Sequence, residues 1–239
     1  MNKSFYTSAV SPWYPLDQAP QNASFLARSE ANYVAVSRSQ SAMAPQLNFV
    51  AEIHHGLPVW QFPFGHRSGD YLAFLGRVAP EKGLDSAIRV ALKTRLPLVI
   101  AAKVEPRYEA YFRQEIKPYF GRNGICFLGE LGQADKLRLL AGARALLMPV
   151  RWQEPFGLVL IEALACGTPV ISFPLGAVPE IIRDGEVGAL VSDETEMAAA
   201  VRAVSQISRQ HCRTHVIRHF SVTTMMERYV RTYRRLLAE

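Results

Sequence analysis

From residue 71 to the end of the sequence, short apolar runs alternate with segments of helical periodicity. This alternation is typical of βαβ units, in which crossover helices connect parallel strands and cover the sheet. The runs are almost continuously apolar, which favours strands that are buried on both faces. The sequence therefore predicts an α/β fold with a doubly wound parallel sheet, whose strands are expected at residues 71–76, 98–102, 125–130, 145–150, 169–173 and 187–191.

The segments between these runs predict the helices that cover the sheet. We expect them at residues 84–94, 107–120, 133–141, 156–166, 178–183 and 195–205, followed by two closing helices at 210–219 and 223–237. Two glycines support this placement, because Gly167 and Gly185 follow predicted helices at positions where helices commonly end.

The region before residue 71 carries a thinner pattern. It predicts a loop at residues 1–32, strands at 33–37 and 49–54, and a short helix between these strands at 40–46. Residues 55–70 have the glycine and proline content of a linker. We therefore expect residues 1–70 to be the remnant of a second α/β domain with its linker, and residues 71–239 to form the main domain.

Composition excludes several classes of protein. Hydrophobic residues make up 49% of the chain and charged residues 20%, which is ordinary for a globular domain. The apolar runs are too short to cross a bilayer, and the segment up to Pro15 mixes polar residues and prolines where a signal peptide needs an apolar core. We therefore expect a cytoplasmic protein. The cysteines lie too far apart for a zinc site and are expected to be small buried hydrophobes, at Cys126, Cys166 and Cys212.

The net charge of +6 is concentrated at the C-terminus. Residues 200–239 contain eight arginines and two glutamates, an excess of six positive charges. A solvated helix face is the favoured interpretation, and contact with a membrane surface or an acidic partner is the alternative. The arginines are not interleaved with aromatic residues and match no nucleic-acid signature, so no nucleic-acid partner is expected.

The turn after the first strand of the main domain carries two cations, in the segment Gly76-Arg77-Val78-Ala79-Pro80-Glu81-Lys82-Gly83. Arg77 and Lys82 can converge across this turn, and the following helix adds free amides and the positive end of its dipole. These features predict an anion site, with a surface turn bearing two solvated cations as the alternative. The segment lacks the glycines of a phosphate loop or a dinucleotide fingerprint, which disfavours ordinary NTPases and dehydrogenases.

A second segment places two carboxylates around the start of an apolar helix, in the order Glu154-Pro155-Phe156-Gly157-Leu158 and then Glu162. Pro155 is expected to start the helix, so that the free amides of the next three residues point out of its N-terminus. Glu162 lies in an otherwise apolar helix, where an unpaired carboxylate is costly to bury. A sugar hydroxyl could satisfy it; a core salt bridge or an exposed helix face is the alternative.

Together these two segments resemble the donor-binding domain of retaining glycosyltransferases of family four, which have the GT-B fold. The resemblance extends through residues 163–171 and 176–180, and more loosely to residues 33–37, which resemble the last strand of that family's acceptor-side domain. It implies a Rossmann-like GT-B C-terminal domain at residues 71–239 and an acceptor-side remnant before it. The implied reaction moves a sugar, with retention, from a nucleoside diphosphate sugar to an unknown sugar, lipid or small-molecule acceptor.

The resemblance also assigns roles to individual residues. In such enzymes the arginine and lysine bind the donor diphosphate and the first glutamate contacts the transferred sugar, which implies catalytic roles for Arg77, Lys82 and Glu154. The second glutamate binds the ribose diol, here Glu162. The remaining donor contacts, including the backbone beside the base at Leu131, are expected at Gly76, Leu131, Phe156, Gly157 and Leu158. No metal or other cofactor is implied, because two cations and two helix ends neutralise the leaving diphosphate; a UDP-sugar is favoured over a GDP-sugar.

Two departures from the family pattern keep alternatives open. After the second strand this chain reads Ala101-Ala102-Lys103, where the family has a glycine-rich turn near the base. The region before residue 71 is also shorter than the family's first domain, so we expect a truncated enzyme. His54 and His55 are expected to be packing or linker residues. The alternatives are a nucleotide-sugar-binding half that needs a partner domain or associates with itself and, with a poorer match, a GT-B epimerase or phosphorylase.

Overall fold

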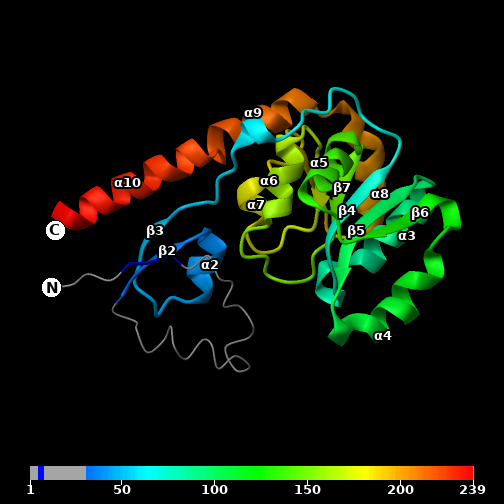
Figure 1. Cartoon of the computed structure of the whole chain (residues 1–239), viewed down its shortest axis with the longest axis horizontal. Helices are drawn as coiled ribbons and strands as arrows, with labels where there is room; N and C mark the ends of the chain where they lie inside the picture. The colour runs from blue at the N-terminus through cyan, green and yellow to red at the C-terminus, as the bar shows by residue number, and fades with distance from the viewer. Residues whose placement is uncertain (1–4, 8–30, 239) are drawn as a thin grey trace.

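The computed structural model describes residues 5–7 and 31–238, which form two parallel β-sheets with flanking helices (Figure 1). The larger sheet has six strands in the order β6-β5-β4-β7-β8-β9. All five neighbouring pairs are parallel. The bounds are β4 Leu72–Val78, β5 Leu98–Val104, β6 Ile125–Gly129, β7 Ala145–Met148, β8 Val170–Ser172 and β9 Gly188–Leu190. The prediction of a doubly wound parallel sheet is confirmed.

The strand order places a topological switch point between β4 and β7. From β4 the chain adds β5 and then β6 on one side, and it then returns to build β7, β8 and β9 on the other side. The loops after β4 and β7 therefore leave the sheet in opposite directions. In open α/β sheets the crevice between two such loops is the usual place for a ligand.

Alternate side chains of the strands point to opposite faces of the sheet, and each face has its own apolar core. Leu72 and Phe74 pack with α3 (Leu84–Thr94) and α8 (Glu194–Ala203) on one face. Ala73 belongs to the other core, together with residues of four helices, α5 (Gln133–Gly142), α6 (Leu158–Ala165), α7 (Val178–Ile181) and α9 (Arg209–His219). Both faces are covered, as the continuous hydrophobicity of the strands predicts.

The region before β4 forms a three-stranded parallel sheet in the order β1-β2-β3. Its elements are β1 Phe5–Thr7, β2 Asn32–Ala35, α2 Arg38–Met43 and β3 Phe49–Glu52. The expectation of a loop over residues 1–32 is wrong at β1, which pairs in parallel with β2; residues 1–4 and 8–30 lie outside the described part of the chain. So short a strand has no readable period, and its pairing comes from the tertiary fold.

The two sheets are tied together by polar contacts. The Glu180 carboxylate of α7 accepts hydrogen bonds from the backbone N–H groups of Arg38 (3.0 Å) and Ser39 (2.9 Å) at the start of α2. The Ser37 hydroxyl donates to the Pro155 carbonyl oxygen at 2.7 Å. These contacts fix the small sheet beside the loop that carries Glu154.

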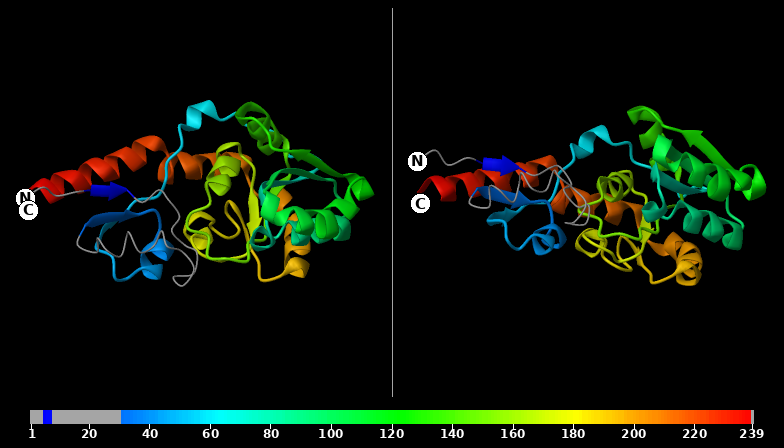
Figure 2. Two further views of the ribbon diagram at one scale, coloured as in Figure 1. Left: turned by 60° about the horizontal axis from the view of Figure 1, so that its bottom comes forward. Right: turned by 90° about the horizontal axis from the view of Figure 1, so that it is seen from below.

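Helix α10 (Val222–Ala238) leaves the large sheet and runs along the small one, as both figures show (Figures 1 and 2). Arg235 donates to the Val50 carbonyl oxygen of β3. The interpretation of the basic tail as a solvated helix face is wrong for two arginines of α9. Arg209 donates to the carbonyl oxygens of Gly65, Ala141 and Ala143, and Arg213 donates to those of Val59, Phe62 and Ala165.

Three other local predictions are corrected by the structure. The helix expected over residues 107–120 is a series of short turns, which include α4 (Glu109–Tyr111) and a π-helical turn over Phe112–Ile116. Pro118 has no N–H to donate and so interrupts the α-helical hydrogen-bond pattern, although Lys117 before it keeps helical backbone angles. Helix α6 begins at Leu158 rather than near Pro155. Among the cysteines, Cys126 is exposed, whereas Cys166 and Cys212 are buried.

Candidate functional site

A cavity of about 400 Å³ opens at the carboxyl ends of β4, β5, β6 and β7. It lies at the switch point of the large sheet and gathers charged side chains from loops that are far apart in the sequence. Its charged lining residues are Arg77, Lys82, Lys103, Glu130, Lys136, Glu154 and Glu162. Eight of the nine residues predicted to bind the donor lie in this lining, namely Gly76, Arg77, Lys82, Leu131, Glu154, Gly157, Leu158 and Glu162.

Lys82 and Glu154 form the central ion pair of the cavity. The Lys82 ammonium lies 2.6 Å from a Glu154 carboxylate oxygen, and the two side chains are only 16% and 9% exposed. The indole N–H of Trp152 donates to the same Glu154 oxygen at 3.0 Å, and the Lys82 ammonium lies 4.5 Å from the centroid of the Trp152 ring. A pair this buried leaves an uncompensated charge when either partner is removed.

The two cations predicted to converge line the same cavity but have different partners. Arg77 belongs to β4 itself, and its guanidinium contacts the carboxylates of Glu105 at 3.2 Å and Glu81 at 3.8 Å. Lys82 is in the short turn of Pro80–Lys82 that precedes α3. Arg77 is more than one-third exposed, so its ion pairs contribute less to stability than the Lys82 pair does.

Glu162 has the salt bridge that the sequence left open as an alternative, and it also lines the cavity. The Lys136 ammonium of α5 lies 2.7 Å from a Glu162 carboxylate oxygen. Both side chains are partly buried. Sequence reasoning missed Lys136. The cost of burying Glu162 inside an apolar helix called for a cation, but the packing of α5 against α6 that supplies it is a tertiary feature.

The far end of the cavity is formed by the ends of β5 and β6. Ala101, Ala102 and Lys103 line it from β5, and Glu130 and Leu131 line it after β6. The Lys103 ammonium lies 3.7 Å from a Glu130 carboxylate oxygen, and both side chains are exposed. Sequence reasoning noted Lys103 only as a departure from the family pattern and did not single out Glu130.

The amide donors of the cavity come from α6. Gly157 caps this helix with a φ of 87°, which is a left-handed backbone conformation that favours glycine, and Leu158 and Val159 open its first turn. Two expectations are corrected here. Phe156 does not line the cavity; its side chain is buried against the rings of His54, His55 and Phe220. The first turn of α3, which was expected to add amides to the anion site, does not line the cavity either; its Asp85 and Ser86 side chains contact Arg151.

His54 and His55 pack where the two sheets meet. The His54 ring nitrogen Nε2 lies 3.0 Å from a Glu180 carboxylate oxygen. Burial, reinforced by the charge of neighbouring His54, lowers the pKa of His55 below its usual range. Both rings contact Phe156, in agreement with their expected packing role.

Two searches of the described residues bear on metals and membranes. Residues 5–7 and 31–238 hold no group of three or more His, Cys, Asp or Glu side chains placed to bind a metal ion. In the same part of the chain, no helix combines the length and the apolar character needed to span a bilayer.

Comparison with known proteins assigns this chain to a family. The family model described as "Glycosyl transferases group 1" matches residues 60–217, which is more than half of the chain. The chain belongs to the glycosyl transferases group 1 family. The match contains every strand of the large sheet and all the cavity residues named above.

Individual relatives agree with this assignment. The chain is 29% identical over 197 residues to the glycogen synthase of Mycobacterium tuberculosis (strain ATCC 25618 / H37Rv), a match that covers 76% of this chain and 47% of that protein. The chain therefore spans about half the length of the curated relatives it matches. The structure of AviGT4, a glycosyltransferase involved in avilamycin A biosynthesis, is similar with a TM-score of 0.72 and 29% identity, covering 86% of this chain and 64% of that one.

A more distant structure supports the fold alone. Anabaena HepE in complex with UDP is similar with a TM-score of 0.80 and 19% identity, over 96% of this chain and 71% of that chain. The compared structures thus share the Rossmann-like arrangement of the large sheet with this chain. The predicted GT-B resemblance is confirmed.

Proposed function

We propose that this chain forms the donor side of a retaining glycosyltransferase, with residues 71–239 binding a nucleoside diphosphate sugar and residues 1–70 belonging to the acceptor side. One observation carries the proposal: Arg77, Lys82, Glu154 and Glu162 line a single cavity at the switch point of the sheet. Two cations and the N-terminus of α6 suit a diphosphate, while two partly buried carboxylates suit the hydroxyls of a sugar and a ribose.

Each group has a distinct task in this proposal. Arg77 and Lys82 hold the diphosphate and stabilise the charge that develops on it as the glycosidic bond breaks. The amides at the start of α6 contact the same phosphates. Glu154 positions the transferred hexose, and Glu162 accepts hydrogen bonds from the ribose diol. In a retaining mechanism the diphosphate leaves on the face that the acceptor attacks, and a phosphate oxygen takes the acceptor proton. Because Arg77, Lys82 and the amides of α6 neutralise the leaving diphosphate, the proposed mechanism does not require a metal ion.

A UDP-sugar is the donor we favour. Among the similar structures, that of HepE has been determined in complex with UDP and in complex with UDP-glucose. The ends of β5 and β6 lie at the far end of the cavity from Lys82, and the backbone at Leu131 is the place we propose for the base. The acceptor, a cytoplasmic location and contact of the basic α10 with an anionic surface remain predictions.

A second candidate function is binding of the donor without transfer. It is favoured by the small sheet, which among the described residues has three strands and one helix, none of whose residues lines the cavity. Sugar transfer needs a second wall that excludes water and orients the acceptor. On this proposal these residues bind the donor by themselves, and efficient transfer requires the remainder of the acceptor side from the same protein, a partner or a second copy.

Substitution of the two glutamates tests the division of roles. Glu162→Gln is expected to weaken binding of UDP and UDP-glucose alike, because the ribose is common to both. Glu154→Gln is expected to spare UDP and to weaken UDP-glucose about tenfold, as the loss of one charge-assisted contact predicts. Titration calorimetry with both ligands measures the difference.

Glu109 offers a matched control, since its exposed carboxylate pairs with Arg113 on the surface. Glu109→Gln should leave both affinities unchanged. Equal losses of UDP affinity in Glu154→Gln and Glu162→Gln would show that the two roles are wrongly divided.

A further inference from the structure

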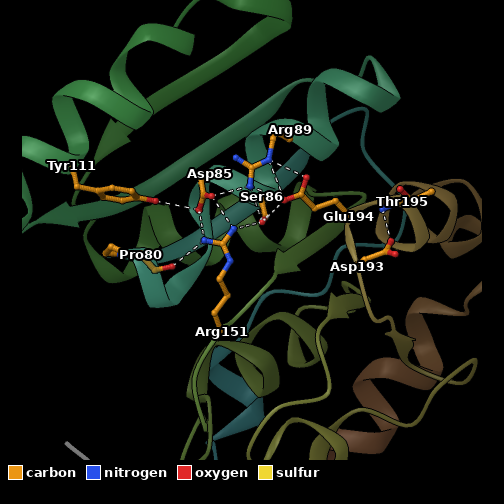
Figure 3. Close-up of polar contacts among 9 residues, drawn as sticks. All are labelled: Pro80, Asp85, Ser86, Arg89, Tyr111, Arg151, Asp193, Glu194 and Thr195. Atoms are coloured by element: carbon orange, nitrogen blue, oxygen red, sulfur yellow. Dashed lines mark hydrogen bonds and ion pairs between the residues drawn. The ribbon is translucent and has the colours of Figure 1, made fainter.

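Arg151 connects the loop after β7, which carries Glu154, to the segment after β4, which carries Lys82; its contacts with Asp85 and Ser86 are drawn in Figure 3. Its guanidinium donates to both carboxylate oxygens of Asp85, at 3.1 and 2.8 Å, and to the hydroxyl of Ser86 at 2.5 Å. Its backbone N–H donates to the Glu81 carbonyl oxygen at 2.8 Å. Arg151, a single residue in the loop after β7, therefore contacts the chain on both sides of Lys82.

Asp85 is held in place by three different elements. Besides Arg151 it accepts hydrogen bonds from Arg89 of its own helix at 2.8 Å and from the Tyr111 hydroxyl at 3.1 Å (Figure 3). Its side chain is 15% exposed. Burial alone would raise the pKa of Asp85, but the hydrogen bonds from Arg151 and Arg89 outweigh it and hold the pKa below its usual range. The carboxylate is thus an ionised, fixed anchor for Arg151.

The same two loops are also in direct backbone contact. A Cβ at Gly83 would lie 2.0 Å from the Pro149 carbonyl oxygen, so the chain before Arg151 packs tightly on the chain after Lys82. Lys82 lies three residues before Asp85, and Glu154 lies three residues after Arg151. The Lys82–Glu154 pair therefore lies within three residues of the Arg151–Asp85 contact on both loops.

We propose that Arg151 is a positioning residue that, through Asp85, sets Lys82 against Glu154 in the donor site. Its effect on ligand affinity rests on the proposed function, whereas its effect on the geometry of the pair does not. A bidentate guanidinium–carboxylate contact fixes direction as well as distance, which a single lysine contact cannot do. Neither Arg151 nor Asp85 lines the cavity.

Arg89 supplies a matched control. It also donates to Asp85 and Ser86, but its other partner is Glu194 of α8 and it makes no described contact with the loop after β7 (Figure 3). Arg89→Gln and Arg151→Gln each remove one positive charge from beside Asp85; the first removes one hydrogen bond to its carboxylate and the second removes two. Only Arg151→Gln loosens the loop that bears Glu154.

The test uses two readouts on the whole chain. The first is the NMR signal of the Trp152 indole N–H, which donates to Glu154 and needs no ligand. The second is the affinity for UDP-glucose by calorimetry. Arg151→Gln should shift the indole signal and weaken UDP-glucose binding about tenfold. Arg151→Lys should restore part of both. Arg89→Gln should lower the free energy of unfolding but change neither the indole signal nor the affinity. In a Lys82→Ala background, Arg151→Gln should add little further loss of affinity.

The outcomes separate the two proposals. If the wild-type chain binds no nucleotide but the Trp152 signal responds to Arg151→Gln alone, the proposed function fails and the positioning role stands. If Arg151→Gln leaves the signal unmoved, or if Arg89→Gln moves it equally, the positioning role is overturned. Should Arg151→Gln not fold, Asp85→Asn takes its place, because it keeps the volume of the anchor and removes its charge.

Discussion

Replacing Gly83 by alanine is expected to destabilise the protein and to abolish most of its nucleotide binding. Gly83 has a φ of 71°, and a Cβ there would lie 2.0 Å from the Pro149 carbonyl oxygen. The left-handed backbone costs an alanine roughly 1–2 kcal/mol. The clash with backbone adds about 1–3 kcal/mol and is relieved only if the loops that carry Lys82 and Glu154 separate. Urea unfolding and UDP calorimetry measure the two effects, and we expect UDP affinity to fall more than tenfold.

Gly121→Ala is the control for this substitution. Gly121 has a φ of 79°, but no atom lies within 4 Å of the position that a Cβ would take. It should therefore show the backbone cost alone, with unchanged UDP affinity. Equal effects of Gly83→Ala and Gly121→Ala on UDP binding would mean that the contact between the two loops has no part in the site.

Removing either cation of the proposed diphosphate site is expected to weaken UDP binding about ten- to hundredfold. Each cation makes charge-assisted contacts worth roughly 1.5–3 kcal/mol. Lys82→Ala should also lower the free energy of unfolding, because it leaves the buried Glu154 carboxylate without its cation. Arg77→Ala should lower it much less, since Arg77 is more exposed. Calorimetry and urea unfolding give both quantities for both variants.

Two further variants test whether the loss of affinity depends on a cation inside the cavity. Lys93→Ala removes a lysine from α3 that contacts Thr195 and lies outside the cavity lining, so it should leave UDP affinity intact. Adding Glu154→Gln to Lys82→Ala should recover stability but not affinity. If UDP binds Lys82→Ala and Arg77→Ala as tightly as it binds the wild-type chain, the cavity does not hold the diphosphate.

The large sheet was predictable because its signals are local. Apolar runs bounded by glycine and proline place each strand to within a few residues, and the helix predicted at residues 84–94 has the bounds of α3. The site motifs were predictable for a related reason, since the carboxyl ends of parallel strands lie along one edge of the sheet. Arg77, Lys82, Glu154 and Glu162 therefore share a cavity although they span more than one-third of the chain.

The unpredicted features depend on contacts between distant segments. Lys136 reaches Glu162 only through the packing of α5 on α6, and Arg151 reaches Asp85 only because the loops after β4 and β7 meet. Arg213 looks like a solvated cation in the sequence but donates to three carbonyl oxygens. The start of α6 was misplaced because Gly157 takes a left-handed conformation between Pro155 and the first helical turn.

Titration of the wild-type chain with UDP, and separately with UDP-glucose, GDP and ADP, measures whether the cavity binds a nucleoside diphosphate and its sugar conjugate. We expect saturable binding of UDP with one site per chain, competition between UDP and UDP-glucose, and affinities for both that are about ten- to hundredfold weaker in Arg77→Ala and in Lys82→Ala. UDP affinity that is unchanged in the folded Arg77→Ala and Lys82→Ala variants would contradict this expectation. So would the absence of binding by any of the four nucleotides to a wild-type chain whose folding has been verified by circular dichroism.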